Sequence, residues 1–233
     1  MEVQDASNVL FYKLWPWVEA NKNKLIGAAV VVLVVIFFVS FFSWRRGQNE
    51  IAAGQSLTQL FTESATTAGP DAEAYLKVAG EYPGTPAAER AQLLAATKYF
   101  ADGQYADAQK QFQNFLDAHP DGDLSADAAL GVAACLEASG KTNLAAGAYQ
   151  QVINGFSGAA PATIAKISLA QLDETQGQLS SALNLYEDVA RANPSSALGS
   201  QAAFQAVQLR EKLPATAAVA PAAKPAAAFN LSH

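Results

Sequence analysis

The stretch GQYADAQKQFQNFLDAHP, residues 103–120, decides the fold because its pattern returns twice along the chain. Its first residue, Gly103, is matched by Gly140 and Gly177, so the period is 37 residues. After each glycine come a small residue, an aromatic ring and an apolar side chain at fixed distances. These columns hold Ala108, Ala145 and Ala182; Phe112, Tyr149 and Tyr186; and Phe115, Val152 and Val189. A fixed period of this length is typical of stacked-repeat proteins, which bind through an extended surface.

Each repeat predicts a helical hairpin. The glycine lies at the turn between two helices, where a positive φ costs little. The alanine column lets the two helices approach closely, and the aromatic and apolar columns share one face of the second helix. Pro120 and Pro194 then end the second helix in two of the repeats.

The first helix of each hairpin repeats as well. Its columns hold Ala91, Ala128, Ala165 and Ala202; Leu93, Leu130, Ile167 and Phe204; and Ala96, Ala133, Ala170 and Val207. A weaker unit precedes them at Tyr75, Val78 and Pro83, and residues 197–213 begin a fifth unit that has no second helix. The sequence therefore predicts an all-α fold, with about four hairpins stacked as an α-solenoid over residues 45–213 and closed by a capping helix.

The pattern at 103–120 resembles the second helix of a tetratricopeptide repeat. The segment Trp17–Gly27, followed by an apolar span and by Trp44-Arg45-Arg46, is similar to the start of the YfgM-type family of membrane-anchored tetratricopeptide repeat proteins. This resemblance implies an ancillary, non-catalytic role beside the Sec translocon. It also implies a membrane-anchored periplasmic chaperone as a partner, and emerging protein chains as clients.

Residues 25–44 predict a single transmembrane helix. They carry no charge, and 20 residues at about 1.5 Å each span about 30 Å, the thickness of a bilayer core. The span ends in bulky residues followed by Arg45 and Arg46, which favours an uncleaved anchor over a signal peptide.

Lysines precede the span and arginines follow it, so the charge bias toward a cytoplasmic N-terminus is narrow. The family resemblance implies the same orientation, in a bacterial inner membrane with the repeat domain periplasmic. Residues 1–24 are interpreted as a cytoplasmic or interfacial segment with a short helix stopped by Pro16. The other interpretation is that this aromatic segment docks against the membrane part of a partner complex. Residues 214–233 are rich in alanine and proline and predict a flexible tail.

Charge and composition exclude several functions. Residues 49–213 carry 18 acidic and 9 basic side chains, a net charge of −9, which argues against nucleic acid as a partner. With two histidines and one cysteine, the chain offers no metal site, no cofactor site, no pocket for a small-molecule substrate and no catalytic constellation, so we do not expect an enzyme. Cys135 is expected to be a buried structural thiol. Asp121-Gly122-Asp123 is interpreted as a turn before a helix that Ser125 caps.

One column suggests a protein-binding groove. Stepping by 37 residues gives four glutamates among five positions, with a glutamine one helical turn before two of them. The candidate groove consists of Glu63, Phe100, Glu137, Gln171, Glu174, Gln208 and Glu211. One hypothesis is an acidic ladder that contacts a basic or extended peptide. The alternative is a set of solvated glutamates that favour the helix and solubility.

Two other functions remain open at this stage. One is an envelope scaffold for division, secretion or pilus machinery. The other is a structural accessory subunit of a large membrane complex, held through residues 1–24.

Overall fold

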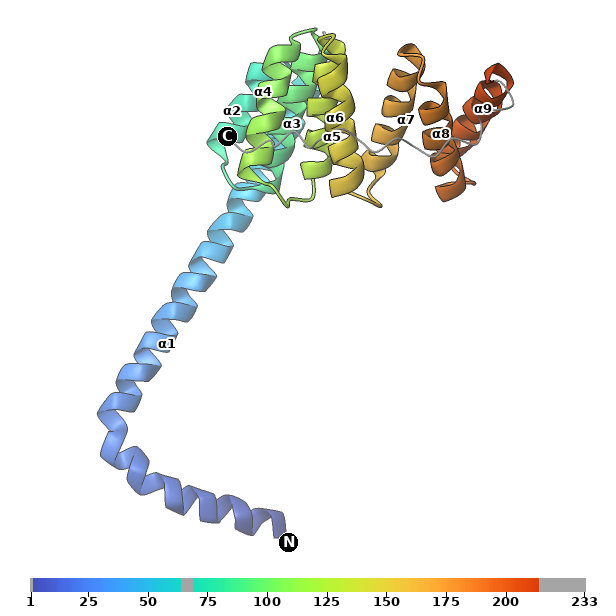
Figure 1. The fold of residues 1–233 in the computed structure, drawn as a ribbon. Coiled ribbons are helices and arrows are strands. Elements are labelled where there is room, and N and C mark those ends of the chain that lie inside the picture. The colour runs from blue at the N-terminus through green and yellow to red at the C-terminus, as the bar shows by residue number, and fades with distance from the viewer. Residues whose placement is uncertain (1, 64–68, 214–233) are drawn as a thin grey trace. The chain divides into compact units, whose positions relative to one another are not determined.

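The computed structural model describes residues 2–63 and 69–213, and all regular structure in these ranges is helical (Figure 1). The helices are α1 (Glu2–Glu63), α2 (Ala72–Glu81), α3 (Pro86–Ala101), α4 (Tyr105–Ala118), α5 (Ser125–Ala138), α6 (Thr142–Gly155), α7 (Ala160–Thr175), α8 (Leu179–Ala192) and α9 (Ala197–Lys212). The prediction of an all-α fold is confirmed over the described ranges.

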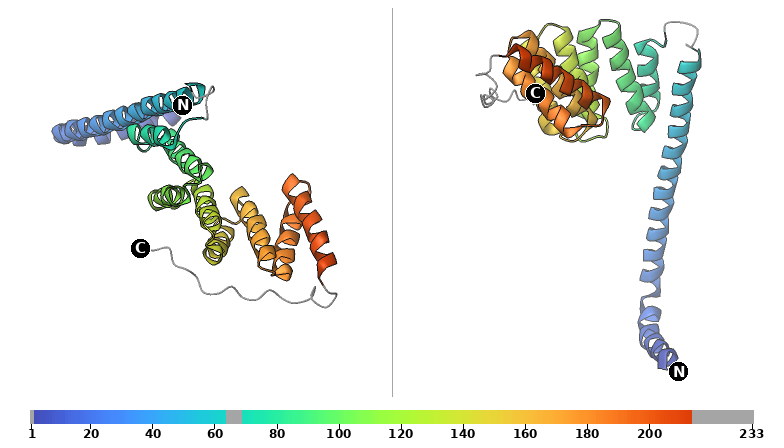
Figure 2. Two further views of the ribbon diagram at one scale, coloured as in Figure 1. Left: turned by 90° about the horizontal axis from the view of Figure 1, so that it is seen from above. Right: turned by 90° about the vertical axis from the view of Figure 1, so that its right-hand side faces the viewer.

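The chain forms two compact units, residues 1–55 and 56–233. In the second unit, α3–α4, α5–α6 and α7–α8 are three hairpins, and they follow one another in sequence order (Figure 2). The end of α1 touches α2 through side chains, with the Phe61 and Tyr75 rings 5.9 Å apart, and stands in the place of the first helix of the degenerate unit without the close packing of the three hairpins. Helix α9 packs on α8 and is the last helix of the described residues, as expected for a cap.

The three repeat glycines close the first helix of each hairpin in the same way. Gly103, Gly140 and Gly177 have φ values of 77°, 73° and 74°. In the first case the Gly103 amide donates to the Phe100 carbonyl and the Gln104 amide to the Tyr99 carbonyl, at 3.0 and 2.8 Å. The other two turns repeat both bonds. This pair of bonds is the Schellman closure, which satisfies carbonyls that would otherwise be unpaired at the helix end.

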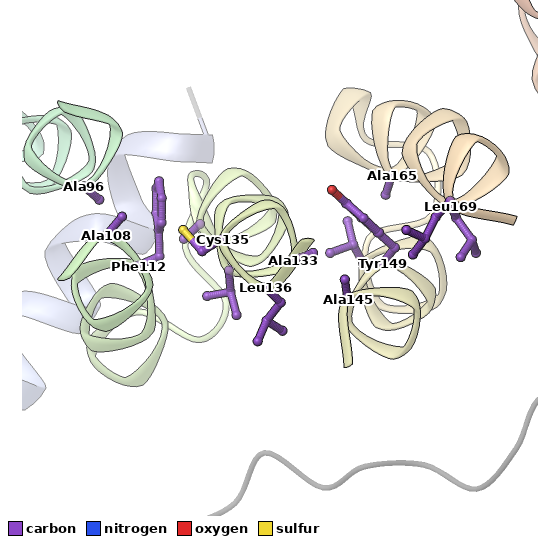
Figure 3. Packing of buried hydrophobic residues seen from close by; sticks show 14 of the residues in the cluster. Ala96, Ala108, Phe112, Ala133, Cys135, Leu136, Ala145, Tyr149, Ala165 and Leu169 are labelled. Atoms are coloured by element: carbon purple, nitrogen blue, oxygen red, sulfur yellow. The ribbon is translucent and has the colours of Figure 1, made fainter. Parts of the chain in front are cut away.

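The alanine columns lie in the core between the helices. All of their members in the three hairpins are fully buried, with an exposed fraction of 0%: Ala91, Ala96, Ala108, Ala128, Ala133, Ala145, Ala165, Ala170 and Ala182. The aromatic and apolar columns of the second helices are buried beside them. Figure 3 shows part of this core, with Ala96 facing Ala108 and Phe112 next to Cys135.

Some local predictions were wrong. Leu124, not Ser125, is the N-cap of α5; Ser125 is buried in the first turn and its hydroxyl donates to the His119 carbonyl, which ties α5 to the end of α4. Helix α1 continues through Pro16 instead of stopping there. In α9, Phe204 and Val207 are 61% and 54% exposed, because within residues 69–213 no second helix follows α9 to cover the columns that are packed in the earlier hairpins.

The first unit consists of the greater part of α1. Every side chain from 30 to 45 is exposed wherever it is described, and most of these side chains are large and apolar. By length and composition alone, Val30–Thr62 contains a stretch that is able to cross a membrane. The domain boundaries 24/25 and 44/45 fall inside α1 without a break in the helix, and residues 214–233 lie outside the described residues. These boundaries therefore stay predictions.

Replacing Gly140 by alanine is expected to lower the free energy of unfolding by about 1 kcal/mol, because an L-residue is strained at positive φ. The matched control is Gly147→Ala. Gly147 is helical and exposed, and an added Cβ would meet nothing within 4 Å. This control is expected to raise the free energy of unfolding by about 0.5–1 kcal/mol. Urea unfolding of the full chain in detergent, followed by circular dichroism, measures both; equal effects of the two changes would contradict the turn assignment.

Candidate protein-binding groove

The candidate column falls at the same place in every first helix. Phe100, Glu137, Glu174 and Glu211 are each the penultimate residue of their helix, in α3, α5, α7 and α9, and Glu63 is the last residue of α1. The Glu63 side chain lies outside the described residues. The common position means that the column follows the solenoid from one first helix to the next.

Two of the glutamates have a buried tyrosine as partner. The Tyr149 hydroxyl donates to Glu137 Oε2 at 2.6 Å, and the Tyr186 hydroxyl donates to Glu174 Oε1 at 2.8 Å. Both tyrosines are almost fully buried, at 2% and 1% exposed, whereas both glutamates are half-buried. Burial, and then the hydrogen bond and negative charge of the glutamate, raise the pKa of each tyrosine well above its ordinary value of 10. Each carboxylate is thereby held in one place.

The hairpin with Phe100 replaces this polar pair by an apolar one. Phe100 occupies the glutamate column and Phe112 the tyrosine column, and the two rings line the same hollow. The pairing is thus matched inside each hairpin: glutamate occurs with tyrosine, and phenylalanine with phenylalanine. Sequence reasoning missed this relation, although the constant separation of 12 residues between the two columns is visible in the sequence.

The remaining candidate residues are less constrained. Gln171 is exposed on α7, one helical turn before Glu174, and Gln208 is half-buried on α9, one turn before Glu211. Residues three apart on a helix are neighbours on its surface, so each glutamine lies beside the glutamate of its own helix. Glu211 is exposed. Glu137 and Glu174 are thus partly buried and hydrogen-bonded while Glu211 faces solvent, and both a binding role and a purely solvated role of the column stay predictions.

A hollow lies beside the apolar pair and was not predicted. Its volume is about 200 Å³, and it is lined by Thr97, Phe100, Phe112, Leu130, Gly131 and Ala134. Gly131 makes the close approach of Phe112 possible, because a Cβ at this position would lie 2.6 Å from the ring carbons. The hollow is therefore bounded by the side of α3, the Phe112 ring and the bare backbone of α5.

Two observations bear on metal and thiol chemistry in the part of the chain that the structure describes. Within these ranges, no three side chains of histidine, cysteine, aspartate or glutamate gather as metal ligands. Cys135 is fully buried, and burial raises the pKa of its thiol to about 11. A thiol in such surroundings stays protonated and unreactive, in agreement with a structural role in the core.

The Glu137–Tyr149 pair is expected to contribute about 1 kcal/mol of coupling in a double-mutant cycle of Glu137→Ala and Tyr149→Phe, since it is a charged hydrogen bond at a half-buried site. The control cycle uses Lys77 and Glu81, an exposed pair 4.0 Å apart, for which the expected coupling is close to zero. Urea unfolding of the full chain gives both values. Equal coupling in the two cycles would show that the carboxylate is not held by the tyrosine.

The raised pKa values of Tyr149 and Tyr186 predict a loss of stability in alkali. The unfolded chain releases both protons near pH 10, while the folded chain retains them. Their stabilising effect is therefore complete below pH 10 and is lost as the pH rises above it. The free energy of unfolding, measured in urea between pH 8 and 11, is expected to fall less steeply above pH 10 for the Tyr149→Phe/Tyr186→Phe double variant; identical slopes would contradict the assignment.

Comparison with known proteins gives the family. A family model described as a tetratricopeptide repeat-like domain matches residues 16–148, more than half of the chain. One similar solved structure is a single-residue variant of the TPR-like repeats described as those of a kinesin light chain from Podosopora anserina. Its sequence is 16% identical and the TM-score is 0.50, and the match covers 71% of this chain and 84% of that chain. BtubC (BKLC) from P. vanneervenii has 14% identity and a TM-score of 0.44, with 80% and 87% of the two chains covered. No curated protein matches. The chain belongs to the tetratricopeptide repeat-like domain family.

Proposed function

We propose that this protein is a non-catalytic protein-interaction scaffold, anchored in a bacterial inner membrane by one helix, with its repeat domain on the periplasmic side. The observation that carries the proposal is the apolar, exposed stretch of α1 in the same chain as a repeat domain of the binding type. The family model matches both parts together, since residues 16–148 include the apolar stretch and the first hairpins.

The physical argument for an anchor rests on side-chain exposure. Valine, isoleucine, leucine and phenylalanine side chains from 30 to 42 are between 42% and 66% exposed in the isolated chain. Apolar surface in water costs about 25 cal/mol per Å², so a run of this length needs an apolar environment. A lipid bilayer provides one, and the helix satisfies its own backbone hydrogen bonds within it.

The resemblance to the YfgM-type family supplies a more specific role. In that role the chain is an ancillary subunit beside the Sec translocon, works with a membrane-anchored periplasmic chaperone, and holds emerging protein chains against its repeat domain. A net charge of −9 over residues 49–213 suits cationic or partly unfolded protein clients better than nucleic acid. Protein clients need no cofactor and no small-molecule substrate. Fold alone does not determine function, so the experiment must identify the proteins that bind to this chain.

The aromatic character of residues 1–24 favours a second candidate, an accessory subunit of a larger membrane complex. In this case the main contact would lie in the N-terminal segment, and the repeats would be secondary. A scaffold for envelope division, secretion or pilus machinery would instead use the repeats, as in the first proposal, with different partners.

Crosslinking in cells, extraction in mild detergent and mass spectrometry of the proteins that copurify with the full chain distinguish these functions. We expect translocon subunits and a periplasmic chaperone, and we expect a control chain without residues 56–213 to lose the chaperone. Recovery of a division, pilus or respiratory complex in their place would overturn the translocon role. Release of all partners by deletion of residues 1–24 alone would favour the accessory subunit.

A further inference from the structure

The regular period allows the junctions between successive first helices to be compared residue by residue. The apolar junction, between α3 and α5, is formed by Thr97, Phe100, Phe112, Leu130, Gly131 and Ala134. The same columns one period later, between α5 and α7, form the first polar junction: Ala134, Glu137, Tyr149, Ile167, Ser168 and Gln171. One more period gives the second polar junction: Gln171, Glu174, Tyr186, Phe204, Gln205 and Gln208.

The apolar junction contains a hollow. Gly131 stands where the polar junctions have Ser168 and Gln205, and the Phe112 ring packs directly on its bare backbone, because a Cβ at this position would lie 2.6 Å from the ring carbons. The hollow of about 200 Å³ lies beside this ring. Water in this space finds few hydrogen-bond partners among the apolar lining residues, so an apolar group that displaces it gains free energy.

The polar junctions present fixed negative charge. In the first of them, the Tyr149 hydroxyl donates to Glu137 and is also hydrogen-bonded to Ser168 on the next helix. In the second, Tyr186 holds Glu174. A carboxylate accepts more than one hydrogen bond, so these groups can take further donors without losing their tyrosines. Lys98, next to the apolar junction, is engaged by Asp102 at 2.5 Å.

From this arrangement we infer that the apolar junction is an anchor site for one bulky apolar side chain of an extended protein segment, and that Glu137 and Glu174 bind lysine or arginine side chains of the same segment. The inference rests on the proposed function, and it specifies the chemistry of the partner. Charge complementarity with the acidic domain selects a basic segment over an acidic one.

The helix spacing sets the spacing of the recognised residues. Packed helices lie about 8–10 Å apart, and an extended chain advances about 3.3 Å per residue. Taking this spacing for the first helices, a segment that crosses them brings roughly every third residue to a new junction. The recognised pattern is a bulky apolar residue, then a basic residue three positions away, then another basic residue three positions further.

Fluorescence anisotropy with the full chain in detergent tests this directly. The probe is the labelled peptide Gly-Ser-Phe-Ser-Ser-Lys-Ser-Ser-Lys-Ser-Gly, together with the same residues in reverse order, since the groove has a direction. One of the two orders is expected to bind at least tenfold more tightly than its version with alanine in place of phenylalanine, because a phenylalanine side chain is buried. Replacing both lysines by glutamate is expected to abolish binding.

Variants of the chain locate the binding site. Ala134→Leu fills the hollow and is expected to reduce the affinity to that of the alanine peptide. The control is Ala138→Leu, the same change on the exposed last residue of α5, with no expected effect. Should Ala134→Leu fail to fold by circular dichroism, Thr97→Leu on the exposed rim of the hollow serves the same purpose.

Three results would overturn the inference: no binding of either peptide order, equal affinity of the phenylalanine and alanine peptides, or equal effects of Ala134→Leu and Ala138→Leu. The proposed function is decided separately, by the partners recovered in cells. Recovery of periplasmic partners without selective peptide binding would remove the anchor site and leave the scaffold role intact.

Discussion

The close approach of helices at alanine is the constraint on which the rest of the structure depends. At these columns the helices meet with no side chain larger than a methyl group between them, and the alanines are fully buried. Packing at protein density leaves no room for an added group. Because the helices meet at alanine, the bulky rings of the next column must pack beside this helix–helix contact, where they reach the following helix. These rings are Phe112, Tyr149 and Tyr186.

The accommodation of these rings differs from hairpin to hairpin. A tyrosine brings a hydroxyl into a buried place, and such a group needs a partner; Glu137 and Glu174 provide it from the penultimate position of the first helix. Phe112 has no hydroxyl, its hairpin has Phe100 in the glutamate column, and Gly131 of the next hairpin lies opposite the ring. The change from acidic to apolar surface along the groove is therefore a consequence of which ring lies in the core.

Much of the fold could be predicted from the 37-residue period. The contacts that could not be predicted share a physical reason. A column of residue types specifies which face of a helix is buried, so the hairpins, the glycine turns and the alanine contacts were predicted correctly from residues such as Gly140 and Ala145. A periodic pattern does not specify which two columns touch across a turn, because this depends on the crossing of the helices. The bond between Glu137 and Tyr149, the hollow at Gly131 and the bond from Ser125 to the His119 carbonyl all belong to this second kind.

A solenoid of this type has a consequence for binding. Each hairpin contacts mainly its neighbours, so local features along the groove change one at a time without disturbing the others. A carboxylate fixed by a buried tyrosine has already lost its rotamer freedom on folding, and a ligand does not have to order it again. The same reasoning applies to the hollow, which exists before anything enters it. The groove thus combines a preformed apolar hollow with preoriented charges. This arrangement favours binding of a short extended segment through a few of its residues over binding of a large folded surface.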